Sequence, residues 1–130
     1  MRFSFLPPET AGKFPPNTQS FAKVGVEEIE GLMEHFCNQE TLFVVSSDLS
    51  HYYDDDTARR IDSHCHAWIE RGEETSMNVC EACGKRGIEG ALSYARKRGL
   101  IARLVAYGTS ADTSGDRGRV VGYGGYVFTR

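Results

Sequence analysis

Residues 43–53, FVVSSDLSHYY, join an apolar run to side chains that can do acid–base chemistry. Asp48 and His51 are three residues apart, so in a tight turn the carboxylate can hold the imidazole in one tautomer and leave its other nitrogen free to move a proton. Ser46 and Ser47 can hydrogen-bond the turn or a ligand. If the apolar run is a strand of an open α/β sheet, its carboxyl end is where ligands bind. A capped turn, in which Ser and Asp satisfy loop amides, is the structural alternative, and the residue pattern leaves both open.

The segment CEACGKRGI carries a second set of reactive side chains. Cys80 and Cys83 have the spacing of half a zinc site. Two candidates for the other half, His64 and His66, would diverge by about 200° on a predicted helix, so they cannot both face one metal. We therefore treat the cysteines separately. Cys83 precedes a predicted helix N-terminus, which favours a thiolate, and Cys80 is expected to pack in the interior. A buried, inert Cys83 thiol and a small zinc-stabilised domain remain the alternatives.

Length and composition indicate one small soluble domain, because 130 residues are 40% hydrophobic and 25% charged. The net charge of −3 and the lack of a basic, aromatic cluster argue against nucleic acid. Apolar runs are too short to span a membrane, and the N-terminus does not read as a signal peptide, so we expect a cytoplasmic protein. In that compartment the four cysteines are expected to be reduced thiols and not a disulfide scaffold.

The elements that must position these residues begin after a proline-rich start. All four prolines lie in residues 1–22, so residues 1–23 are predicted to form an irregular arm. The pattern then predicts, in chain order, a helix over 26–38, a strand over 42–45, a helix from the aspartates at 54–56 to Gly72, and a helical turn over 73–79. A loop that opens at Cys83-Gly84 follows, then a helix with a stop at Gly99, a strand over 100–107, a glycine-rich loop over 108–118 and a strand over 119–129.

Two packing expectations follow from this pattern. The strand over 42–45 is wholly apolar, which is typical of a strand buried on both faces of a parallel sheet. The helix that ends at Gly72 has an apolar stripe, which predicts the buried residues Ala58, Ile61, Cys65, Trp68 and Ile69. The histidines at 35, 64 and 66 are expected on helix surfaces. Alternating helices and strands predict an α/β layered domain.

Four motifs in this order and spacing resemble the Memo family, whose bacterial and archaeal members are called AmmeMemoRadiSam system protein B: SSDLSHYY, ACGKRGI, YGTSADTSGDRGR and VVGYGGYVF. The resemblance covers residues 24–130 and identifies them as the C-terminal half of a Memo-like α/β domain. It implies part of a three-layer α/β/α sandwich, similar to the class III (LigB-type) extradiol dioxygenases.

The resemblance also implies a non-haem iron or copper site. Cys83 would be a metal ligand, His51 the acid–base residue and Asp48 its support. The family's other two metal ligands are histidines of an N-terminal half, and no residue of this sequence matches them. The site would therefore be completed by residues outside this chain, and dioxygenase-like oxidoreductase activity follows only by analogy of fold.

Two functions are consistent with this resemblance. In the first, the chain is a metal-binding, redox protein whose partner is the missing N-terminal half or a second copy of the chain. In the second, it is a non-catalytic interaction module that partners radical-SAM and Amme-domain proteins.

Overall fold

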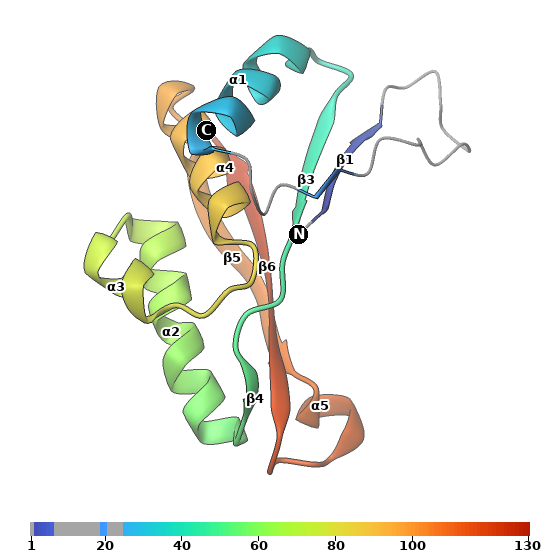
Figure 1. The fold of residues 1–130 in the computed structure, drawn as a ribbon, viewed down its shortest axis with the longest axis vertical. Helices are drawn as coiled ribbons and strands as arrows, with labels where there is room; N and C mark the ends of the chain where they lie inside the picture. Colours follow the sequence, from blue (N-terminus) through green and yellow to red (C-terminus); the bar gives the residue numbers. More distant parts are fainter. Residues whose placement is uncertain (1, 7–18, 21–24) are drawn as a thin grey trace. The chain divides into compact units, whose positions relative to one another are not determined.

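The computed structural model describes residues 2–6, 19–20 and 25–130 (Figure 1). The chain divides into two compact units. The first consists of residues 1–46 and 84–98, and the second of residues 47–83 and 99–130. Each unit has its own three-stranded sheet, and every strand pairing within the described residues is antiparallel.

The first unit contains a sheet in the order β2-β1-β3 and two helices. Its elements are β1 (Arg2–Leu6), β2 (Gln19–Ser20), α1 (Val26–Phe36), β3 (Leu42–Ser46) and α4 (Lys85–Lys97). The helices α1 and α4 pack closely because Gly90 leaves room for Ile29. A Cβ added at Gly90 would lie only 2.5 Å from Ile29 Cγ2. Ile29 is 1% exposed and anchors this contact.

The predicted arm, residues 1–23, contains β1 and β2, while residues 1, 7–18 and 21–24 lie outside the described residues. The expectation for the next strand is wrong. The strand β3 is antiparallel to β1 and is not buried on both faces. Phe43 contacts the ring of Tyr94 in α4 on one face, whereas Leu42 and Val44 on the other are exposed. An all-apolar strand is therefore not sufficient evidence for a parallel sheet.

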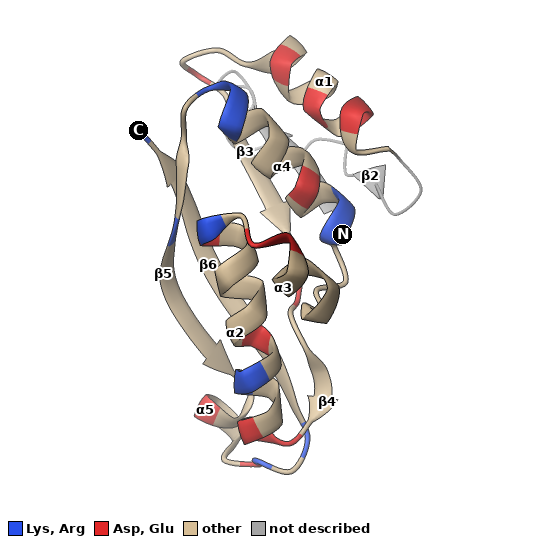
Figure 2. Ribbon diagram, turned by 90° about the vertical axis from the view of Figure 1, so that its left-hand side faces the viewer, with Lys and Arg blue, Asp and Glu red and all other residues tan. Residues whose placement is uncertain are grey.

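The second unit contains a sheet in the order β4-β6-β5 and helix α2, which packs against β5 and β6 (Figure 2). Its elements are β4 (His51–Tyr53), α2 (Asp55–Arg71), α3 (Glu74–Val79), β5 (Ile101–Thr109), α5 (Ala111–Ser114) and β6 (Val120–Thr129). The strand β4 was not predicted from the sequence. The bounds of α2 were predicted correctly, because the residues that start and end a helix are local signals. Asp54 caps its start by accepting from the Thr57 amide, and Gly72 ends it with a φ of 72°.

A disulfide joins Cys65 of α2 to Cys80, the residue after α3. The expectation of four reduced thiols is therefore wrong, although Cys80 is fully buried as predicted. The turn after Gly72 lets α3 fold back along α2, which brings the two Cα atoms to 4.7 Å. Cys37 and Cys83 are free and exposed.

The described residues form a mixed α/β protein, in agreement with the broad prediction of fold class. None of their helices is long and apolar enough to cross a membrane.

Candidate functional site

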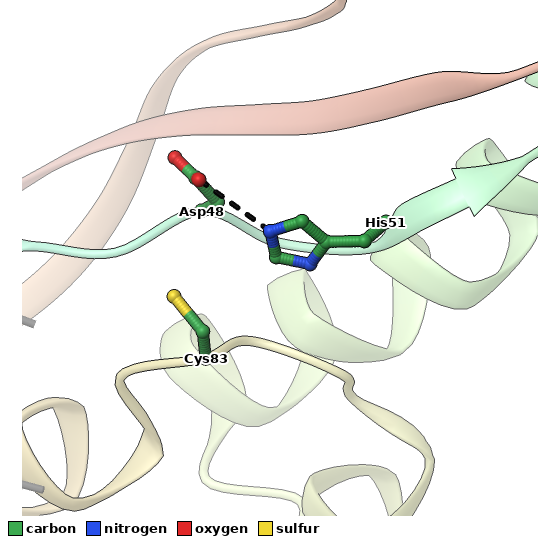
Figure 3. A group of neighbouring side chains, drawn as sticks. All are labelled: Asp48, His51 and Cys83. Atoms are coloured by element: carbon green, nitrogen blue, oxygen red, sulfur yellow. Dashed lines mark ion pairs between the residues drawn. The ribbon is translucent and has the colours of Figure 1, made fainter.

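Three predicted site residues come together in the second unit (Figure 3). Asp48 lies in the loop after β3, His51 begins β4, and Cys83 lies in the segment after α3. Their ligand atoms, a carboxylate oxygen, an imidazole nitrogen and the thiol sulfur, all lie within 4.8 Å of one another. The structure thus brings together residues that are as much as 35 positions apart in the chain.

Main-chain hydrogen bonds fix the segment that carries Asp48 and His51. The Leu49 amide donates to the Gly122 carbonyl, and the Gly122 amide donates to the Ser50 carbonyl, both at 2.9 Å. The Cys83 amide donates to the Asp48 carbonyl at 3.2 Å, which ties the cysteine to the same segment. The side chain of Leu49, which is 2% exposed, anchors the segment in the core.

Asp48 and His51 form an ion pair when the imidazole is protonated. Asp48 Oδ2 lies 3.4 Å from His51 Nε2. Because the carboxylate faces Nε2, the nitrogen that does not face Asp48 is Nδ1. The side chain of Asp48 is 50% exposed and that of His51 is 32% exposed, so solvent reaches the pair and weakens its electrostatic attraction.

The two predicted substrate-binding serines differ in position. Ser47 Oγ donates to the Asp48 carbonyl at 2.8 Å and lies 3.6 Å from Cys83 Sγ, where either atom can donate. Ser47 is therefore part of the cluster. Ser46 is the last residue of β3 and belongs to the other compact unit, so its role stays a prediction.

A buried carboxylate supports this segment from the interior. Asp62 of α2 is fully buried and accepts three hydrogen bonds, from the Ser50 amide at 2.9 Å, from Ser50 Oγ at 3.0 Å and from Tyr107 Oη at 2.5 Å. Sequence reasoning missed Asp62 and selected its neighbour Ile61 for the buried stripe. The signal was present, because Asp62 is four residues after Ala58 and three before Cys65 on the same helix face.

Three ring side chains, Tyr107, His66 and Tyr126, form a connected group beside Asp62. Burial, and then the hydrogen bond to Asp62, raise the pKa of Tyr107. Burial also raises the pKa of Tyr126, whose hydroxyl is hydrogen-bonded to His66 Nδ1. The pKa of His66 is lowered by burial, so its neutral form is favoured. His66 is only partly exposed, and its ring contacts those of Tyr107 and Tyr126, so it is not the ordinary helix-surface residue that was expected.

The zinc-domain alternative is also wrong. It requires the thiolates of both Cys80 and Cys83, and the sulfur of Cys80 is bonded to Cys65. Cys83 is the cysteine whose thiol remains for a metal in the cluster.

Comparison with known proteins agrees with the sequence motifs. Residues 16–127 match the family model of Memo-like proteins. A MEMO1 family protein of Archaeoglobus fulgidus is 35% identical over 101 residues, which are 73% of this chain and 38% of the relative. A MEMO1 family protein of Aquifex aeolicus is 34% identical over 100 residues, which are 69% of this chain and 36% of the relative.

These alignments cover little more than a third of the length of the relatives. No solved structure matches the chain significantly. The family match spans most of the 130 residues, including Asp48, His51 and Cys83. The chain belongs to the Memo-like family.

Proposed function

We propose that this chain contributes one side of a metal-binding redox site, with Cys83 as a metal ligand and His51 as the acid–base residue. The observation that carries the proposal is the convergence of Asp48, His51 and Cys83 ligand atoms within 4.8 Å. A thiolate and an imidazole suit iron and copper, so the donor set fits the metals that the family resemblance implies.

A bound iron or copper would supply Lewis-acid and redox chemistry. The chain's own residues would bind and move protons around it. Asp48 orients the imidazole through Nε2, which leaves His51 Nδ1 to accept or donate a proton. The Ser47 hydroxyl can donate to the Cys83 thiolate or turn to a substrate, and Ser46 is proposed as a second substrate contact.

A partner chain would complete the site. A metal with Cys83 as its one thiolate ligand from this chain is expected to bind weakly. About two thirds of the length of each of these relatives lies outside the region that this chain matches, which leaves room for further ligands. We propose that the missing N-terminal half, or a second copy of the chain, supplies them and completes an α/β/α sandwich similar to the class III extradiol dioxygenases. A cytoplasmic location is part of the same proposal.

The sheet of the second unit supports association with a partner. Four large apolar side chains on β5 and β6 are between 46% and 65% exposed: Ile101, Val105, Tyr123 and Val127. Exposed apolar side chains on one hairpin favour a protein contact. This observation also supports the second candidate function, an interaction module for radical-SAM and Amme-domain proteins. That function requires a stable complex that is unaffected by Cys83→Ala.

Elemental analysis of the purified chain tests the metal proposal. Wild type is compared with Cys83→Ser and with Cys37→Ser, which changes the other free, exposed cysteine. Light scattering on the same samples gives the molecular mass. We expect iron or copper in wild type and Cys37→Ser and its loss in Cys83→Ser. Equal metal content in all three samples would contradict the proposal. A chain that stays empty after loading with either metal would mean that the site needs the missing half and that this chain alone is not the enzyme.

A further inference from the structure

Asp62 occupies an unusual position for a carboxylate, because it is fully buried in the stripe through which α2 packs on its sheet. Within the described residues, its hydrogen bonds come from Ser50 and Tyr107, and no ion pair involves it. A buried carboxylate without a cationic partner is destabilising compared with an apolar side chain of similar size. A role beyond packing is therefore needed to account for it.

The hydrogen bonds of Asp62 indicate that role. Ser50 directly precedes His51, and both its amide and its hydroxyl donate to Asp62. On the opposite side, the Ser50 carbonyl accepts from the amide of Gly122 in β6. The Ser50 backbone is thus held between α2 and β6, one residue from the imidazole and two from Asp48.

The sheet leaves room for this arrangement. A Cβ added at Gly122 would lie 2.0 Å from Asp62 Oδ2 and 3.2 Å from Ser50 Oγ. Only glycine therefore lets β6 approach the carboxylate while its amide bonds to Ser50. Gly122 and Asp62 together hold the backbone at Ser50 in place.

We infer that Asp62 is a positioning residue for the candidate site, which acts through Ser50 to set where Asp48 and His51 present their side chains. The inference rests on the proposed function for its metal readout, whereas its geometric readout does not need a metal. Residues that hold ligands in place typically change metal affinity by about 10–100-fold when they are removed.

A matched pair of variants separates positioning from general stability. Ser50→Ala and Tyr107→Phe each remove one hydroxyl that donates to Asp62 Oδ2, but only the first lies on the site's side of the carboxylate. Asp62→Ala removes all three bonds. Asp62→Asn keeps an oxygen for the Ser50 amide and places an amide group opposite the two hydroxyls, so it is the conservative rescue.

The metal readout is titration of the full chain with Co²⁺, followed by the thiolate-to-cobalt absorption band. We expect Asp62→Ala to weaken Co²⁺ affinity by about 10-fold or more, and Ser50→Ala to weaken it by a smaller factor. Asp62→Asn and Tyr107→Phe should stay close to wild type. Equal affinities for Ser50→Ala and Tyr107→Phe, or wild-type affinity in Asp62→Ala, would overturn the inference.

The metal-free readout is the set of NMR signals of the His51 ring. We expect them to move in Asp62→Ala and Ser50→Ala and to stay in place in Tyr107→Phe. If wild type binds no Co²⁺, this chain alone does not hold the metal, and the ring signals decide the inference. If Asp62→Ala does not fold, the Ser50→Ala and Tyr107→Phe pair decides it. Unchanged His51 signals in Ser50→Ala would then refute the positioning role.

Discussion

The disulfide between Cys65 and Cys80 should contribute strongly to stability. The two cysteines are 15 residues apart, and closing a loop of that length restricts the unfolded chain enough to stabilise the folded state by about 3 kcal/mol. For a chain of this size we expect the melting temperature to fall by roughly 10 °C when the bond is removed. Urea unfolding of wild type with and without reductant, and of Cys65→Ala, measures this loss directly.

A thiol count provides the control for this prediction. Unfolded, unreduced wild type should show two free thiols, which belong to Cys37 and Cys83. Cys37→Ser should lower the count by one and leave the urea midpoint almost unchanged, because Cys37 is exposed and outside the bond. Four free thiols in wild type, or a midpoint insensitive to reductant, would refute the reasoning.

Three further predictions concern packing and pH. Gly90→Ala should destabilise the chain by about 1–2 kcal/mol in urea unfolding, because its Cβ meets Ile29 and the overpacking exceeds the gain in helix propensity. Gly122→Ala should lower the free energy of unfolding by more, about 2–4 kcal/mol in urea unfolding, since its Cβ displaces the buried Asp62 carboxylate. Hydrogen bonds from Thr109 first, and then from Arg59, lower the pKa of Asp55. The ionised Asp55 therefore stabilises the fold fully above the ordinary carboxylate pKa of about 4, and this stabilisation is lost as the pH falls through the lower folded-state pKa. In Asp55→Asn the urea midpoint should consequently depend less on pH in this acid range.

Controls for these predictions come from the same chain. Gly31 in α1 has no atom within 4 Å of an added Cβ, so Gly31→Ala should stabilise the protein by about 0.5–1 kcal/mol through helix propensity. A stabilising Gly90→Ala would contradict the close contact between α1 and α4. An Asp55→Asn variant that loses stability on acidification as steeply as wild type would show that another group dominates.

Local signals made the ends of two helices predictable from sequence. The bounds of α2 follow from an aspartate cap and a glycine stop, and the end of α4 from Gly99, whose φ is 67°. The strands could not be assigned partners in the same way. The pairing of β1 with β3 joins residues about 40 positions apart, and no local pattern encodes it.

The candidate site was predictable only where its residues are close together in the sequence. Asp48 and His51 are close because they are three residues apart, and the polar end of the apolar run indicated them. The approach of Cys83 came from the family resemblance and not from spacing. Asp62 was missed because the helical stripe was read for apolar residues only, although a carboxylate within such a stripe is itself the signal of a buried polar contact.

The central claim is that Asp48, His51 and Cys83 form one site, in which Cys83 binds the metal and His51 is the acid–base residue beside it. A double-mutant cycle on Co²⁺ affinity tests it most directly, with Cys83→Ser, His51→Ala and the combined variant in the full chain. We predict that each single change weakens binding and that the double change weakens it less than the sum, with a coupling of about 0.5–3 kcal/mol. Strictly additive effects, or an affinity that Cys83→Ser does not change, would contradict a shared site.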